Sequence, residues 1–179
     1  YTSNDMPGAN YGSTYMYDNV GHGLGEVPEM IIVKNRDDSQ NWAVWHKDLD
    51  DDNSLILNDV DAQSVTGYFP TSEQAHTAYT FTVGGDSSTG GYEPVNHYDN
   101  SAMEGQDFVA YLFRSVEGYS KVGSYTGNVD ADGPFVYCGF RPAFLLIKSD
   151  DDWHWVMLDS TRDTYNVIGG TPGEGGALF

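Results

Sequence analysis

The chain contains one unit twice, and this internal repeat restricts the possible folds more than any other feature. The first copy, VPEMIIVKNRDDSQNWAVWHKDL, spans residues 27–49, and the second, RPAFLLIKSDDDWHWVMLDSTR, spans residues 141–162. The second copy is one residue shorter between its lysine and its aligned tryptophan. The aligned pairs are Pro28 and Pro142, Lys34 and Lys148, and Trp42 and Trp155.

Each copy predicts two β-strands joined by a polar turn. Branched and aromatic residues fill the strand segments, and each strand begins after a proline, which is tolerated at a strand's first position. The Asp-rich stretches between them are predicted turns, where carboxylates bond nearby backbone amides. Weaker similarity upstream extends the modules to residues 11–49 and 122–162. A module of this size cannot bury its own apolar face, so we expect the copies to face one another or lie side by side.

The rest of the chain also favours β-structure, because no window has the apolar spacing of an amphipathic helix. A polar connection over residues 82–106 is expected to be an exposed loop. The stretch 107–118 is expected to be a central strand covered on both faces. Further strands are expected over residues 54–58, 79–85, 119–125 and 134–140.

The predicted architecture is therefore a single all-β domain over residues 1–179. We expect a β-sandwich or jelly-roll-like fold, in which the two modules share a core with middle strands from residues 54–118. The equivalent segments 29–35 and 143–149 should form equivalent strands. Their alternating apolar residues should be buried in both copies, namely Ile31, Val33, Phe144 and Leu146 or their neighbours.

The charge excludes several classes of partner. Eight Lys and Arg against 27 Asp and Glu give a net charge of −19. Such a field repels phosphate backbones and anionic lipid surfaces, so neither nucleic acid nor a membrane is expected as a partner. No stretch approaches the roughly 20 apolar residues of a membrane span. The acidity suits either general solubility or a halophilic protein, in which about 1 M salt screens repulsion beyond ~3 Å.

One acidic turn has the spacing of a calcium loop. Asn128, Asp130 and Asp132 lie at alternate positions, and Gly133 follows at the place of the sharp turn. The twelfth position is Gly139, however, so the usual bidentate Glu is missing. An ordinary Asp-rich turn is the favoured interpretation, with calcium as the alternative. A weaker candidate lies at residues 48–53.

The tryptophans divide into two pairs. Trp42 aligns with Trp155, which indicates a shared core role. Trp45 and Trp153 have no tryptophan counterpart, so one of them is a candidate for stacking on a sugar ring. Cys138 is the only cysteine, so no disulfide forms within the chain, and we expect it to be a small buried apolar residue.

No catalytic motif is present. The sequence lacks a Gly-x-Ser-x-Gly elbow, a phosphate-binding Gly-rich loop and a His-Glu-x-x-His pair. The five histidines are scattered. We expect His22 to form local hydrogen bonds in a turn, and His46 and Asp159, which occupy matching positions of the repeat, to lie on the surface. The sequence therefore predicts a protein that is not an enzyme.

Three blocks of the chain resemble a β-rich domain of unknown function found in structural and tail-fibre-like proteins of tailed viruses. They are HGLGEVPEMIIVKNRDDSQNWAVWHKDL, FVAYLFRSVEGYSKVGSYTGN and ADGPFVYCGFRPAFLLIK, and the resemblance covers roughly residues 18–166. It implies a virion component outside the cell that contacts other virion proteins, forms a homo-oligomer and is part of a longer chain. The alternative is an extracellular carbohydrate-binding or glycan-depolymerising module.

Overall fold

The described part of the chain consists of β-strands and their connections. The computed structural model describes residues 1, 15–50, 53–70, 76–86, 95, 106–130 and 132–161. In these ranges no helix is long and apolar enough to cross a membrane. The all-β prediction is confirmed. The strands are β1 (Tyr15–Gly21), β2 (Met30–Asn35), β3 (Ala43–His46), β4 (Asn53–Ile56), β5 (Ser64–Val65), β6 (Thr80–Asp86), β7 (Phe108–Phe113), β8 (Phe144–Ile147) and β9 (Val156–Asp159).

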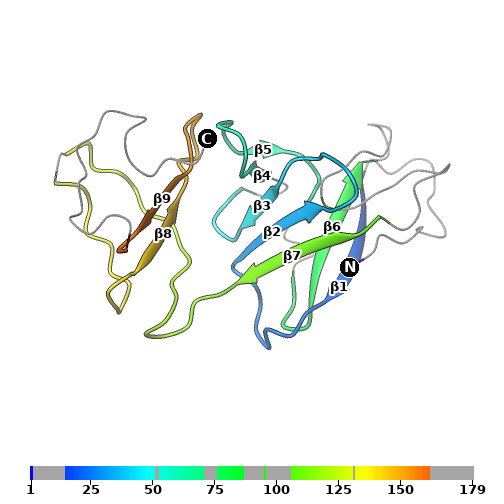
Figure 1. Ribbon diagram of the computed structural model, residues 1–179, viewed down its shortest axis with the longest axis horizontal. Helices are drawn as coiled ribbons and strands as arrows, with labels where there is room; N and C mark the ends of the chain where they lie inside the picture. Colours follow the sequence, from blue (N-terminus) through cyan, green and yellow to red (C-terminus); the bar gives the residue numbers. More distant parts are fainter. Residues whose placement is uncertain are drawn as a thin grey trace.

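The strands form three antiparallel sheets (Figure 1). A five-stranded sheet has the order β5-β4-β3-β2-β7, and β1 pairs with β6 over the full length of both strands. The third sheet is the hairpin β8–β9. The middle strands therefore all pair within the sheets of the first module, and none of them pairs with a strand of the second.

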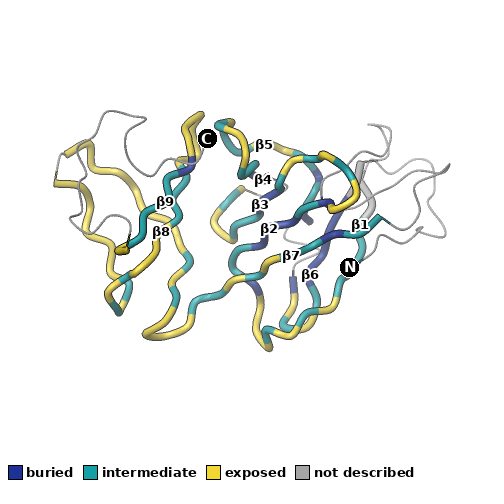
Figure 2. The backbone as a smooth tube through the Cα atoms, viewed as in Figure 1, coloured by how far each residue is buried: buried dark blue, intermediate teal, exposed yellow. Residues whose placement is uncertain are grey.

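Two of the sheets pack face to face in a β-sandwich-like arrangement. Ile31 and Val33 of β2 and Phe81 and Val83 of β6 are buried in one apolar cluster between the sheets, which we call the first cluster. Burying a side chain of this size contributes about 1.5–3 kcal/mol to stability. Figure 2 shows the buried positions concentrated in these strands, whereas exposed positions dominate the second module. The main core therefore lies between the first module and β1–β6.

The other face of the five-stranded sheet contacts the second module. Ile32, Val44 and Leu55 share a second cluster with Trp155, which is only 4% exposed, and Leu146 packs against it. The indole Nε1 of Trp155 donates a hydrogen bond to the oxygen of Ile56 at 2.9 Å. The two modules thus meet through one shared apolar cluster.

The two hairpins have the same register, so the strand-turn-strand part of the repeat has the same pairing in both copies. Met30 lies opposite His46, and at the aligned positions Phe144 lies opposite Asp159. The remaining three pairs of each ladder correspond in the same way. The shorter turn of the second copy leaves this pairing unchanged. Segments 29–35 and 143–149 therefore form equivalent strands, as the sequence predicts.

The turns of the two hairpins are also held by equivalent bonds. The ammonium group of Lys34 donates to two backbone oxygens of its turn, and that of Lys148 does the same. A lysine ammonium group that bonds the carbonyl oxygens of its own turn takes the place of the water molecules that would otherwise donate to them. The acceptors are the oxygens of Asn35 and Asp38 in the first copy and of Ser149 and Asp151 in the second.

Several expectations about the second half are wrong. Residues 119–125 and 134–140 form no strand beyond a single bridge at Ser120, and Cys138 is partly exposed outside any strand. In the first module, β1 has β6 as its ladder partner. The second copy has no counterpart of β6 among the described residues, so its upstream segment lacks a strand to pair with.

The burial and position of two strands also differ from expectation. Phe144 is 54% exposed and Leu145 is 39% exposed, although Ile31 and Val33 in the first copy are fully buried. Strand β7 lies at the edge of its sheet rather than in the centre. The exposure of β8 follows from the topology, because no middle strand pairs with the hairpin β8–β9. Most of the predicted loop 82–106 lies outside the described residues.

Candidate functional site

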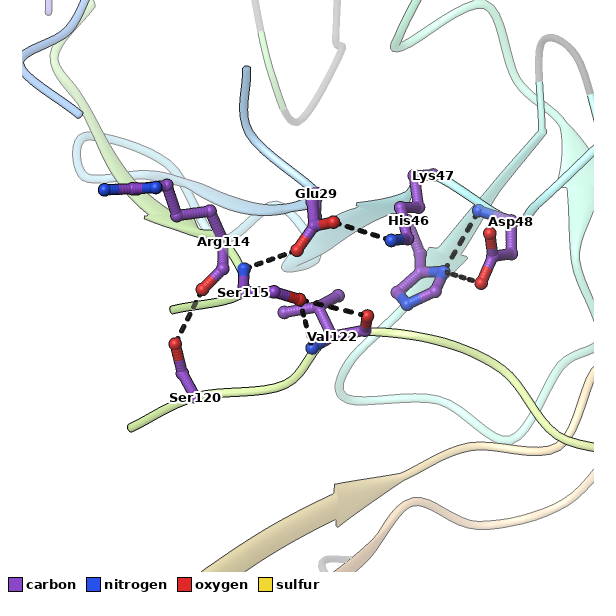
Figure 3. A network of polar contacts seen from close by, with 8 residues as sticks. All are labelled: Glu29, His46, Lys47, Asp48, Arg114, Ser115, Ser120 and Val122. Atoms are coloured by element: carbon purple, nitrogen blue, oxygen red, sulfur yellow. Dashed lines mark hydrogen bonds and ion pairs between the residues drawn. The ribbon is translucent and has the colours of Figure 1, made fainter. Parts of the chain in front are cut away.

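The carboxylate of Glu29 connects three segments, namely the start of β2, the end of β3 and the chain after β7 (Figure 3). The Oε1 atom of Glu29 accepts a hydrogen bond from Lys47 Nζ at 2.6 Å, and Oε2 accepts one from the backbone N–H of Ser115. Partial burial raises the pKa of Glu29, but these bonds outweigh it and lower the pKa to about 2. Glu29 is therefore ionised near neutral pH and fixes the start of β2 to β3 and to the segment after β7.

A compact turn continues from this carboxylate toward the second module. The hydroxyl of Ser115 accepts from the N–H of Val122 at 3.1 Å, and Ser120 Oγ donates to the oxygen of Arg114 at 2.7 Å. Gly118 at the turn has φ +73°, a left-handed conformation that glycine adopts at low cost. These bonds fix the path of the connection between the modules, which is a structural role.

The equivalent positions His46 and Asp159 also serve turns. His46 Nδ1 accepts from the N–H of Asp48 at 3.2 Å, and Asp159 Oδ1 accepts from the N–H of Thr161 at 3.0 Å. Burial lowers the pKa of His46, which favours the neutral ring that this bond needs. Both residues end their strands and are partly buried, so they are less exposed than the sequence predicts.

Two other histidines have structural roles. His22 Nδ1 accepts from the N–H of Leu24 at 3.2 Å, which confirms its local hydrogen bonding. His76 is buried, its Nδ1 accepts from the N–H of Thr82 at 3.0 Å, and its Nε2 has no partner among the described residues. Burial, together with the nearby His22, lowers the pKa of His76 to about 4. A neutral imidazole buried in this way is part of the core.

The structure separates the tryptophans by environment. Trp155 is buried and Trp42 is partly buried against the same second cluster, so their shared core role is confirmed. Trp45 packs against the first cluster, with its ring 4.2 Å from that of His76 in an edge-on contact. Trp153 is 57% exposed beside the second hairpin. Of the two candidate sugar-stacking residues, Trp153 is the one whose ring is open to solvent.

The acidic turn uses its side chains for the backbone. Asn128 Oδ1 accepts from the N–H of Asp130, and Asp130 Oδ1 accepts from the N–H of Asp132, at 3.1 and 3.0 Å. These bonds are typical of an Asp-rich turn. In the part of the chain that the structure describes, no group of three or more His, Cys, Asp or Glu residues is placed to hold a metal ion. Calcium binding stays a prediction, and the second candidate at 48–53 lies partly outside the described residues.

The second module exposes many apolar side chains. Of the buried apolar residues in the described ranges, only Trp155 comes from beyond β7. Sequence reasoning missed this surface because apolar strand-like segments normally predict a core. We call the exposed apolar residues of the second module and of the turn before it the second-module surface. It consists of Tyr119, Tyr125, Val129, Phe135, Val136, Tyr137, Phe144, Leu145 and Trp153.

The chain belongs to a family described as a domain of unknown function, DUF7483, whose model matches residues 8–173. The match covers both modules and the strands between them. No curated protein and no solved structure is significantly similar to the chain.

Proposed function

We propose that this DUF7483 domain is a non-enzymatic structural and interaction domain of a virus particle, such as a tail fibre, a spike or a capsid-surface protein. The observation that carries the proposal is the second-module surface. Contiguous exposed apolar patches on soluble proteins mark contact sites. Here nine large, exposed apolar residues lie between positions 119 and 153 of a chain with a net charge of −19.

The architecture supports a contact role in a second way. Hydrogen bonds and a buried cluster hold the first module rigidly, and the Glu29 carboxylate fixes the connection to the second module. A buried first module to which an exposed apolar surface is anchored is suited to positioning that surface for contact with another protein. The three sequence blocks that resemble domains of tailed-virus proteins indicate the setting, which is the outside of a virion. The partners would be other virion proteins and a host-surface molecule.

Immunogold labelling of virus particles released by cells that produce the chain tests this role. We expect label on the particle surface, and we expect the purified domain to compete with virions for adsorption to host cells. Tyr137→Asp in the second-module surface should abolish the competition. Tyr79→Asp is the matched control, because Tyr79 is equally exposed, at 77%, but lies outside that surface. Virions without label would contradict the proposal.

A carbohydrate-binding module is the second candidate, favoured by one observation. The Trp153 ring is open to solvent, and aromatic faces of this kind stack on sugar rings. A glycan array with the purified domain should then show binding that Trp153→Ala removes and Tyr79→Ala retains. A reducing-sugar assay on the bound glycan would show whether depolymerisation follows binding. An array without any bound glycan would remove this candidate.

A further inference from the structure

The ion pair between Glu29 and Lys47 is present in only one of the two hairpins. In the first copy the backbone N–H of Lys47 donates to the oxygen of Glu29 at 3.0 Å, and the two side chains pair at 2.6 Å. The aligned residues of the second copy are Ala143 and Ser160, and the N–H of Ser160 donates to the oxygen of Ala143 at 2.9 Å. The second hairpin therefore forms the same ladder with no charge at these positions. The ion pair is not required for the hairpin.

The pair instead holds the segment that follows β7. Oε1 of Glu29 is bonded to Lys47, which leaves Oε2 to accept the backbone N–H of Ser115 (Figure 3). Hydrogen bonds to an ionised group are roughly twice as strong as those between neutral groups. We call residues 114–122 the strap and the Glu29–Lys47 pair its latch, because the pair fastens the strap to the first module.

The other hydrogen bonds of the strap lie within it. The N–H of Val116 donates to the oxygen of Ser120 at 3.0 Å, and the N–H of Ser120 donates back at 2.9 Å. The N–H of Val122 donates to Ser115 Oγ at 3.1 Å. Among the described residues, the bond to Glu29 is the only hydrogen bond between the strap and the first module. The attachment of the strap therefore depends on the latch.

Both polar groups of the peptide bond between Arg114 and Ser115 are occupied while the strap is closed. The oxygen of Arg114 accepts from Ser120 Oγ at 2.7 Å, and the N–H of Ser115 donates to Glu29. The Arg114 side chain extends away from the Glu29 carboxylate (Figure 3). Trypsin-like proteases bind a basic side chain in this position and polarise the adjoining carbonyl in their oxyanion hole. Arg114 thus supplies the side chain that such an enzyme needs, whereas the closed strap withholds the carbonyl.

We propose that the strap opens locally when the latch is released, and that the open strap is cleaved by trypsin-like proteases between Arg114 and Ser115. Cleavage adds one water molecule across the peptide bond, which leaves a carboxylate on Arg114 and an amino group on Ser115. The hairpins β2–β3 and β8–β9 stay folded in the open state, because neither ladder includes a residue of the strap. This protease site is independent of the proposed viral role.

The population of the open strap should set the rate of cleavage. Proteolysis through a transiently open state follows the population of that state when opening and closing are fast relative to cleavage. Loss of a hydrogen bond to a charged group shifts such a local equilibrium about tenfold or more. Glu29→Ala removes the acceptor of the Ser115 N–H, so it should raise the rate of cleavage after Arg114 about tenfold.

Limited proteolysis of the whole chain tests the proposal, with an arginine-specific protease that leaves Lys121 intact. Mass spectrometry follows the fragments that end at Arg114, which Glu29→Ala should increase. Glu117→Gln is the matched control, because it removes an exposed carboxylate of the strap that does not belong to the latch, and it should leave the rate unchanged. Cleavage after Arg36 reports on the first module and should be the same in all samples.

A double variant keeps the test decisive if Glu29→Ala does not fold. Glu29→Ala combined with Lys47→Ser gives the first hairpin the residues of the second, which forms its ladder without the pair. Hydrogen exchange should then be faster at the N–H groups of Ser115 and Val122 and unchanged in β2–β3. A native chain cut after Arg114 as fast as a peptide of residues 110–119, or a rate that Glu29→Ala does not raise, would overturn the proposal. Faster exchange throughout β2–β3 would overturn it equally, because the pair would then support the hairpin.

Discussion

The hairpins β2–β3 and β8–β9 have the same register and the same lysine bonds across their turns, yet they lie in different surroundings. The first is covered on both faces, by β1–β6 on one side and by Trp155 on the other. The second packs against the second cluster through Leu146, whereas Phe144 and Leu145 of the same strand are exposed. Local sequence thus specifies the hairpin, whereas the neighbouring strands determine how much of it is buried.

This difference has energetic consequences. An isolated two-stranded hairpin is marginally stable in water, because it cannot bury enough apolar surface. The second hairpin therefore depends on its contacts with the second cluster. The first hairpin has neighbouring strands on both edges and clusters on both faces. Substitutions at aligned positions of the two copies should accordingly differ in cost.

The largest effect is expected at the contact between the modules. Trp155→Ala should lower the free energy of unfolding by about 3–5 kcal/mol, because it leaves a cavity among Ile32, Val44 and Leu55. Trp153→Ala, two residues away and exposed, should change it by no more than about 0.5 kcal/mol. Urea denaturation followed by circular dichroism measures both values. Equal costs would show that the shared cluster does not form.

Two aligned residues, each on the hairpin face turned away from the second cluster, should show the difference in burial directly. Ile31 and Leu145 are aligned, but Ile31 is fully buried whereas Leu145 is partly exposed. Ile31→Ala should cost about 2–5 kcal/mol, and Leu145→Ala less than about 1 kcal/mol. The same denaturation experiment compares them. A Leu145→Ala cost as large as that of Ile31→Ala would mean that something covers the second hairpin.

A buried histidine, His76, should make the free energy of unfolding depend on pH in the acid range. The pKa of His76 falls from 6.5 to about 4 on folding, because burial, and then His22, disfavours the charged ring. The unfolded chain therefore takes up the proton first as the pH falls. His76 should contribute stability above pH 6.5 that is progressively lost toward pH 4, on the order of 2–3 kcal/mol.

The variant His76→Phe isolates this contribution from the other titrating groups. Its stability relative to the native chain should rise as the pH falls from 6.5 to 4, measured by urea denaturation at each pH. Near neutral pH, the remaining difference in free energy of unfolding measures the loss of the hydrogen bond that the N–H of Thr82 donates to His76. A stability difference that does not change with pH would mean that His76 is not buried as a neutral ring.

The sequence predicts part of this structure, for identifiable reasons. The repeat, the all-β class and the equivalence of Trp42 with Trp155 follow from residue types and their spacing, which local structure obeys. The exposure of Phe144 does not follow, because an apolar strand has the same pattern whether or not another sheet covers it. The edge position of β7 cannot be predicted from its sequence either, because edge and central apolar strands have similar sequences and differ in the strands beside them.

The smallest effects are expected where the two copies agree. Lys34→Met and Lys148→Met each remove a donor that bonds two backbone oxygens of a turn. Each should cost about 1 kcal/mol, because water replaces the lost donor at these accessible carbonyls. Thermal melting of the two variants, with Lys121→Met as an exposed control, compares them. Costs that differ greatly between the two lysines would contradict the equivalence of the turns.

Native-state hydrogen exchange tests the central claim most directly, namely that one hairpin occurs twice but only the first copy is enclosed. The measurement follows backbone amides of β2–β3 and β8–β9 in dilute buffer. We predict that β2–β3 amides exchange only through global unfolding, whereas β8–β9 amides exchange through a smaller, local opening. Trp155→Ala should accelerate β8–β9 further. Equal protection of the two hairpins in the native chain would contradict the account.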